Sequence, residues 1–221
     1  MAVRVGDKTM HHKAVFIDKD GTLIENVPYN VNPKLIQFTD GMKEGLKLLS
    51  QAGYKLIIIS NQSGIARGKF KEEELLSLGD HLCKKLEKMG VPIAGFYYCP
   101  HHPGGKIEQY SINCFCRKPN PGMLFQASRD HSINLAESWM VGDILDDMEA
   151  GRRTECRTIM INNGNETEWR LTSNRRPHFV ANNMLEVAEL ILAEQDRPRA
   201  QIVSHKLLKT SVQAAHTNAR V

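Results

Sequence analysis

Short runs of apolar residues alternate along the chain with longer segments in which apolar residues recur every three or four positions. The runs are typical of buried strands, and the spaced segments are typical of amphipathic helices. The pattern predicts five strands, at residues 14–18, 55–60, 95–99, 139–143 and 157–161. It predicts helices at residues 41–52, 71–89, 121–131, 146–152 and 184–193.

This alternation favours an α/β fold, a doubly wound, Rossmann-like parallel sheet with helices on both faces. In such a sheet, ligands bind beyond the carboxyl ends of the strands. Polar residues directly follow Ile17, Ile59 and Val141, each at the end of a predicted strand. We therefore expect these polar residues to meet at one edge of the sheet and to form the functional site.

Length and charge define the domain organisation. The 221 residues fit one domain or two small ones. The net charge is +4, but residues 196–221 hold five of the 29 basic and one of the 25 acidic residues, which leaves 24 of each in residues 1–195. We expect residues 1–195 to form the domain and residues 196–221 to be a basic tail, disordered or a short helix.

The absence of net charge in residues 1–195 argues against nucleic acid as a partner.

Two further patterns indicate the compartment. No apolar run approaches about 18 residues, which excludes a membrane span, and the first 13 residues lack the apolar core of a signal peptide. The cysteine count of five is odd, as expected of reduced thiols. We expect a cytoplasmic monomer that does not bind a membrane.

The sharpest chemical motif is the pair Asp18 and Asp20, followed by Gly21 and Thr22. Two carboxylates two positions apart on a loop can face one small site, and the string is specific. The alternative is an Asp-rich turn, which is common after strands.

Three other segments are weak indications of a functional site by themselves and support one only in combination with Asp18 and Asp20. The residues Ser60, Asn61, Gln62 and Ser63 offer a hydroxyl and backbone N–H groups that could hold phosphate oxygens, although such loops are common. Arg117 and Lys118 supply cations or are merely surface charge. Asp143 and Asp147 share one side of a helical turn, where they could also cap the helix.

Together, Asp18, Asp20 and Asp143 would place three negative charges in one pocket. Two unit charges about 4 Å apart interact by about 4 kcal/mol at a partly buried site, so the pocket requires cations. Lys118 supplies one charge, and Mg²⁺, which prefers hard oxygen ligands, supplies two more.

A second candidate metal centre comprises Cys99, His101, Cys114 and Cys116. Three thiolates and one imidazole complete a closed tetrahedral site for a structural Zn²⁺. We call residues 99–116 the zinc loop. The alternatives are unrelated reduced cysteines, or His102 in place of His101.

In order and spacing, these motifs resemble the haloacid dehalogenase (HAD) superfamily of phosphohydrolases. The resemblance implies that Asp18 is the nucleophile and that Asp20 is the general acid and base. It implies that Mg²⁺ binds Asp18, the backbone carbonyl of Asp20, and Asp143. Ser60 and Asn61 would hold the phosphoryl group, Lys118 would neutralise it, and Asp147 would support Lys118 or the metal shell.

The strings FIDKDGTLI, SNQSGIARGKF, YYCPHHPGG, CFCRKPNPGML and MVGDILDDMEAG more closely resemble the D-glycero-D-manno-heptose 1,7-bisphosphate 7-phosphatases, with histidinol-phosphate phosphatases as relatives. The resemblance implies a Mg²⁺-dependent phosphatase that removes the 7-phosphate of a heptose bisphosphate. It assigns recognition of the 1-phosphate to Arg117. Family members often carry a lysine where this chain has Ile144, which affects substrate identity and anomer preference.

Only 17 residues separate Thr22 from Asp40, too few for a cap domain, so we expect an open site for a small phosphorylated metabolite. Three alternatives remain: a histidinol-phosphate or other small-metabolite phosphatase, an inactive binding module stapled by zinc, and a polynucleotide 3′-phosphatase. The last conflicts with the neutral core, and an inactive module would not be expected to keep both aspartates. The expected substrate-binding residues are Asn26, Val27, Pro28, Tyr29, Ser60, Asn61, Gln62, Ser63, Arg117 and Lys118.

Overall fold

A six-stranded parallel sheet is the centre of the computed structural model, which describes residues 11–195. The strand order is β3-β2-β1-β4-β5-β6. This arrangement confirms the predicted parallel sheet. The strands are β1 (Ala14–Ile17), β2 (Lys55–Asn61), β3 (Ile93–Cys99), β4 (Trp139–Gly142), β5 (Arg157–Ile161) and β6 (Phe179–Ala181).

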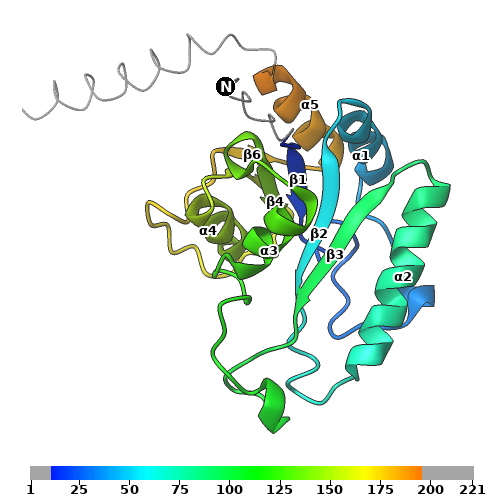
Figure 1. Ribbon diagram of the computed structural model, residues 1–221, viewed down its shortest axis with the longest axis vertical. Coiled ribbons are helices and arrows are strands. Elements are labelled where there is room, and N and C mark those ends of the chain that lie inside the picture. Colours follow the sequence, from blue (N-terminus) through cyan, green and yellow to red (C-terminus); the bar gives the residue numbers. More distant parts are fainter. Residues whose placement is uncertain (1–10, 196–221) are drawn as a thin grey trace, which may run out of the picture. The chain divides into compact units, whose positions relative to one another are not determined.

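The sheet is covered on both faces, which explains why its central strands are continuously apolar. All four residues of β1 are fully buried. Figure 1 shows α3 and α4 on one side of the sheet and α1 and α2 on the other. The helices are α1 (Met42–Gln51), α2 (Glu72–Lys88), α3 (Gly122–His131), α4 (Leu145–Arg153) and α5 (Met184–Gln195), with single turns at η1 (Pro33–Leu35), η2 (Glu108–Tyr110) and η3 (Leu135–Glu137).

The strand order reverses between β1 and β4. From β1 the chain proceeds to β2 and β3 on one side, and then returns to place β4 on the other side of β1. A crevice forms at such a switch point, beyond the carboxyl ends of the two strands. Asp18 directly follows β1 and Asp143 directly follows β4, so both acids lie at this crevice.

Sequence patterning missed one strand. It predicted five of the six, with ends within two residues, and overlooked β6. This strand has only three residues, and Val180 in its middle is 53% exposed because β6 lies at the edge of the sheet. In a half-exposed strand of three residues, the alternation of apolar and polar positions is too short to indicate a strand.

The segment between Thr22 and Asp40 contains η1 and an isolated bridge between Ile24 and Phe38, with no separate cap domain. By their contacts, residues 11–188 belong to one compact unit and residues 189–195 to a second, and the division falls within α5. The tail predicted at residues 196–221 lies outside the described residues. Within residues 11–195, no helix is long and apolar enough to cross a membrane.

Candidate active site

Lys118 and two carboxylates form the buried centre of the site. The Lys118 ammonium contacts Asp18, lies 2.5 Å from the Asp147 carboxylate and donates to the carbonyl of Ile59 at 3.1 Å. The Lys118 and Asp147 side chains are almost fully buried. The sequence left open whether Asp147 would support the lysine or a metal, and the geometry shows a direct ion pair with the lysine.

The carboxylates outnumber the cation. Oxygens of Asp18, Asp143 and Asp147 all lie within 4.8 Å of one another, around the single ammonium of Lys118. Burial raises the pKa of Asp18 to about 7, although the charge of Lys118 opposes the shift. Burial likewise raises the pKa of Asp143 to about 6. A divalent cation would offset the remaining charge of −2, and its preferred ligands are hard oxygens such as these.

Asp20 stands at the mouth of this centre, with 28% of its side chain exposed. One of its oxygens lies 2.6 Å from the buried ammonium of Lys19, and the other accepts a hydrogen bond from Gln62 Nε2 at 2.8 Å. The same Gln62 nitrogen lies 2.7 Å from Ser60 Oγ. Gln62, predicted to bind substrate, therefore links Asp20 to the hydroxyl at the end of β2.

Asp143 is held by two neutral donors. Thr22 Oγ1 donates to Asp143 Oδ1 at 3.0 Å, and Asn165 Nδ2 donates to Asp143 Oδ2 at 2.7 Å. Gly21, with a φ of +89°, passes so close that an added Cβ would lie 2.1 Å from Asp143 Oδ2. Glycine is required here for both its conformation and its lack of a side chain.

The Asn61 side chain holds the main chain of Lys118. Its side-chain amide donates to the carbonyl of Lys118, and its side-chain oxygen accepts from the Lys118 backbone N–H, both at 3.0 Å. Both polar ends of this side chain contact the Lys118 main chain, and phosphate binding by Asn61 stays a prediction.

Two cavities flank the site. One, of about 290 Å³, is lined by Asp20 together with the predicted substrate-binding residues Asn26, Val27, Pro28, Tyr29, Asn61, Gln62 and Ser63. The other, of about 230 Å³, has Arg117, Lys118, His102, Asn113, Asn120 and Asp146 in its wall. The structure therefore separates Arg117 from most of the predicted substrate-binding residues.

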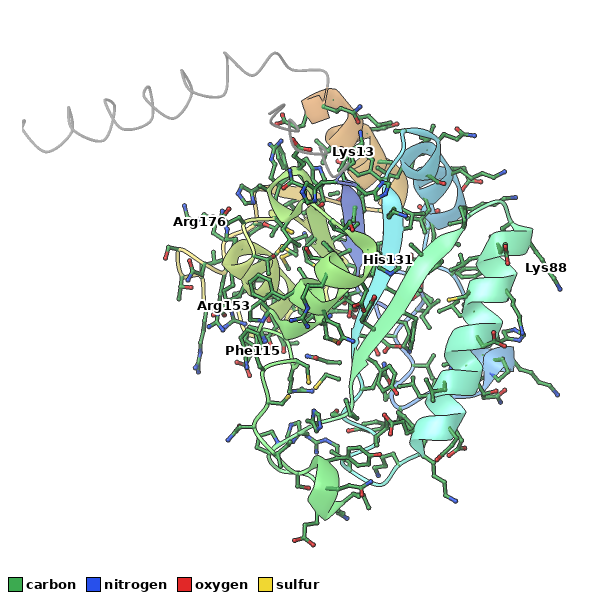
Figure 2. The ribbon with its side chains drawn as sticks, in the orientation of Figure 1. Lys13, Lys88, Phe115, His131, Arg153 and Arg176 are labelled. Carbon is green, nitrogen blue, oxygen red and sulfur yellow. The ribbon has the colours of Figure 1, made fainter. Side chains whose placement is uncertain are left out.

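The zinc loop brings its predicted ligands together. The sulfurs of Cys99, Cys114 and Cys116 are 3.2 to 3.5 Å apart, and His101 Nδ1 lies 3.3 Å from Cys116 Sγ. A tetrahedral zinc site with bonds of about 2.3 Å needs a similar spacing. The contact with the Cys99 sulfur lowers the pKa of Cys116 to about 5, which favours a thiolate. These four side chains could hold a metal ion. Phe115, labelled in Figure 2, separates two of them in the sequence and is 63% exposed.

His102 lies outside this cluster. Its Nδ1 accepts from the backbone N–H of Gly104, and its Nε2 lies 3.0 Å from Arg67 Nη2. The histidine whose ring nitrogen lies beside the cysteine sulfurs is therefore His101.

Residues on the loop after β5 were missed. Asn163 Nδ2 donates to the carbonyl of Gly21 at 2.6 Å, Asn165 contacts Asp143, and Glu166 accepts from the backbone N–H of Leu145 at 2.6 Å. The sequence could have indicated them, because polar residues directly follow the predicted fifth strand. The same pattern after Ile17, Ile59 and Val141 was the basis for predicting the site.

Comparison with known proteins identifies the family. The HAD-hydrolase-like family model matches residues 115–187. The D-glycero-β-D-manno-heptose-1,7-bisphosphate 7-phosphatase of Photorhabdus laumondii is 45% identical over 148 residues, 67% of this chain and 79% of that protein. The phosphatase of the same name from Pasteurella multocida is 40% identical over 181 residues, 81% of this chain and 96% of that protein.

A solved structure similar to this chain has a name of the same kind as these relatives. It is the D,D-heptose 1,7-bisphosphate phosphatase of B. bronchiseptica in complex with magnesium and phosphate, with a TM-score of 0.67 and 28% identity over 82% of this chain and 99% of that one. The chain therefore belongs to the HAD-like hydrolases, in the family of the D-glycero-D-manno-heptose-1,7-bisphosphate 7-phosphatases.

Proposed function

We propose that this protein hydrolyses the 7-phosphate ester of D-glycero-D-manno-heptose 1,7-bisphosphate. The observation that carries the proposal is the position of Asp18, whose carboxylate contacts the Lys118 ammonium, on the loop that also places Asp20 at the mouth of the site. Relatives at 40–45% identity are named as phosphatases for this substrate.

Asp18 is the nucleophile. Its carboxylate oxygen attacks phosphorus and the bond from phosphorus to the ester oxygen breaks, while Asp20 gives its proton to the leaving alkoxide. Asp20, then a carboxylate, takes a proton from water, whose oxygen attacks the same phosphorus and releases Asp18 and inorganic phosphate. Lys118 reduces the repulsion between the Asp18 carboxylate and the phosphate throughout.

The residues present fit a magnesium ion. Asp18, Asp143 and the backbone carbonyl of Asp20 would hold it, and a divalent cation would stabilise the clustered buried carboxylates in their charged form. When bound, Mg²⁺ lowers the electrostatic cost of bringing a phosphate dianion to a carboxylate. The B. bronchiseptica relative, solved with magnesium and phosphate, supports this choice.

We assign a structural zinc ion to Cys99, His101, Cys114 and Cys116, because all four ligands come from the protein. The backbone N–H of Arg117 donates to Cys114 Sγ at 3.3 Å. The zinc loop thus fixes the start of the segment that carries Arg117 and Lys118.

The two cavities fit the two ends of a sugar bisphosphate. The cavity beside Asp20 receives the sugar chain next to the reacting phosphate. Arg117 lines the other cavity with His102, and Arg67 lies beside His102, so cationic and N–H donor groups gather there. We assign the phosphate that is not hydrolysed to this second cavity. Ile144 adds no charge to it.

The test is a phosphate-release panel with Mg²⁺. Its substrates are both anomers of the heptose 1,7-bisphosphate, histidinol phosphate, hexose phosphates and 3′-phosphorylated oligonucleotides. We expect a kcat/KM for one heptose anomer at least tenfold above every other compound. A higher value for histidinol phosphate or an oligonucleotide would overturn the substrate assignment, and no release from any phosphate ester would overturn the proposed reaction.

A further inference from the structure

The loop that follows β5 makes three side-chain contacts with the site, each to a different element. Asn163 Nδ2 donates to the carbonyl of Gly21, on the loop after β1. Asn165 Nδ2 donates to Asp143, directly after β4. Glu166 accepts from the backbone N–H of Leu145, the first residue of α4. The loop therefore links the segments that follow β1 and β4 at the switch point.

Asn165 has the most direct contact with the proposed chemistry. Its amide donates to Asp143 Oδ2 at 2.7 Å, while Thr22 donates to the other oxygen at 3.0 Å. Asp143 is only 3% exposed, so these bonds are shielded from water. An amide N–H₂ and a hydroxyl leave further lone pairs on each carboxylate oxygen, and those lone pairs are what a cation needs.

The Asn165 side chain is itself held in place. Its backbone N–H donates to Asn163 Oδ1 at 3.2 Å, in a local turn that also directs the Asn163 amide to Gly21. An added Cβ on Gly21 would lie 2.5 Å from Asn165 Nδ2, so the amide packs against the Gly21 backbone. The position of Asn165 is thus tied to the loop that carries Asp18 and Asp20.

We propose that Asn165 is a positioning residue that orients the Asp143 carboxylate for the divalent cation. This inference deepens the proposed function and rests on it for the identity of the cation, Mg²⁺. Residues that hold a metal ligand by hydrogen bonds typically change metal affinity by about 10- to 100-fold when they are lost. Asn165 does not touch the substrate in this assignment, so it acts through Asp143 alone.

The experiment compares Mg²⁺ binding to the purified full chain and its variants, without substrate. Asn165→Ala removes the bond to Asp143. Asn162→Ala is the matched control, because Asn162 is an exposed residue of the same loop. Asn163→Ala removes the bond to Gly21 and the bond that its side chain accepts from the Asn165 backbone N–H, but it leaves both donors on Asp143. Mg²⁺ is titrated by calorimetry, and the rise in Tm that it produces is measured in parallel, since the stabilisation by a ligand grows with the logarithm of its concentration divided by Kd.

We expect Asn165→Ala to weaken Mg²⁺ binding about tenfold, Asn163→Ala to weaken it less, and Asn162→Ala to leave it unchanged. Asn165→Gln, which keeps the amide, should recover part of the affinity and serves as the test variant should the alanine variant not fold. In steady-state assays the Mg²⁺ concentration for half-maximal rate should rise for Asn165→Ala, while kcat at saturating Mg²⁺ returns towards wild type.

Unchanged Mg²⁺ affinity in a folded Asn165→Ala protein would overturn the inference, as would an equal loss in Asn162→Ala or no Mg²⁺ binding by the wild type. The titration needs no substrate, so it separates the two proposals. The wild type could bind Mg²⁺ with an affinity that depends on Asn165 and yet hydrolyse no phosphate ester. That result would overturn the proposed function and leave this inference standing.

Discussion

Asn61 forms a pair of hydrogen bonds with the main chain of Lys118, across 57 residues of sequence. The asparagine ends β2, and the lysine follows the last zinc-loop ligand by two residues. The pair therefore joins the sheet to the segment that supplies the only ammonium in contact with Asp18 among residues 11–195. An amide side chain suits this position, because it supplies one donor and one acceptor to a peptide unit.

Asn61→Ala should reduce both stability and turnover. The change leaves a buried lysine N–H and carbonyl without these partners, which costs about 1–3 kcal/mol in the free energy of unfolding. Displacing the ammonium by as little as about 1 Å can lower kcat by about 100-fold. Denaturant unfolding and steady-state kinetics measure the two effects.

Asn134→Ala is the control for this change. Asn134 caps η3, before β4 and therefore at the end of the sheet away from the site. Losing such a cap costs about 1 kcal/mol, so the control should lose stability without losing kcat. Equal kcat values in the two variants would show that the Asn61 pair has no part in positioning Lys118.

Asp18→Asn should abolish phosphate release while the protein stays folded. The amide cannot form the acyl phosphate, so kcat should fall at least about 1000-fold. Lys118 keeps Asp147 as its counter-ion, so the substitution leaves no buried charge unpaired. Turnover and circular dichroism are measured beside Asp130→Asn, a change of the same kind at a residue whose carboxylate contacts Tyr97. Retained turnover in Asp18→Asn would disprove the nucleophile assignment.

Purified protein should contain about one zinc ion per chain, and a strong chelator should remove it with a marked fall in Tm. The reason is that binding energy at a closed site contributes directly to folding. Cys114→Ser should lower both zinc content and Tm. Cys83→Ser should change neither, because this half-buried thiol is not part of the cluster. Elemental analysis under reducing conditions provides the measurement, and a zinc-free, stable wild type would rule out the ligand set.

His178 should make the protein less stable in mild acid. Burial, with the charges of Arg152 and Arg157, lowers the pKa of His178 from 6.5 to about 4. Its Nδ1 accepts from the backbone N–H of Thr158, which requires the neutral ring. His178 therefore binds a proton near pH 6.5 in the unfolded chain but only near pH 4 in the folded chain. The contribution of the neutral ring to the free energy of unfolding is present above pH 6.5 and is lost as the pH falls to about 4.

The test compares the free energy of unfolding of the wild type and His178→Gln between pH 7.5 and 4. Buried carboxylates with raised pKa values contribute the opposite slope, but they are common to both proteins and cancel in the difference. The ring is partly exposed, so screening makes the effect modest. The wild type should lose stability relative to the variant as the pH falls, and parallel curves would contradict the assignment.

Deleting residues 197–221 should leave kcat/KM within about twofold of wild type. Every residue assigned here to the active site, its cavities or the zinc loop lies between residues 18 and 166, while the deleted segment carries the excess basic charge. A large loss of kcat/KM for the heptose bisphosphate would show that the tail contributes to the site.

Local sequence patterns were sufficient for most of the fold and for the candidate residues that gather at one edge of the sheet. The apolar run that forms β1 predicts burial by itself, and an acid that directly follows such a run must lie at the sheet edge, which places Asp18 and Asp143. The cysteine and histidine spacing in the zinc loop likewise selects a metal centre. The strands and the acids that follow them depend on neighbours within a few residues, and the four zinc-loop residues lie within one segment of 18 residues, so no tertiary information is needed to recognise them.

Only the tertiary structure decided how those groups are held. The pairs Asn61 with Lys118 and Asn165 with Asp143 span 57 and 22 residues, and an asparagine in a loop has no local pattern that names its partner. The choice of His101 over His102 depended on which ring nitrogen lies beside Cys116, and Cys116 is 15 residues from His101 in the sequence. Hydrophobic periodicity fixes which face of an element is buried, but hydrogen-bond partners follow from how the elements pack, and packing is a property of the whole chain.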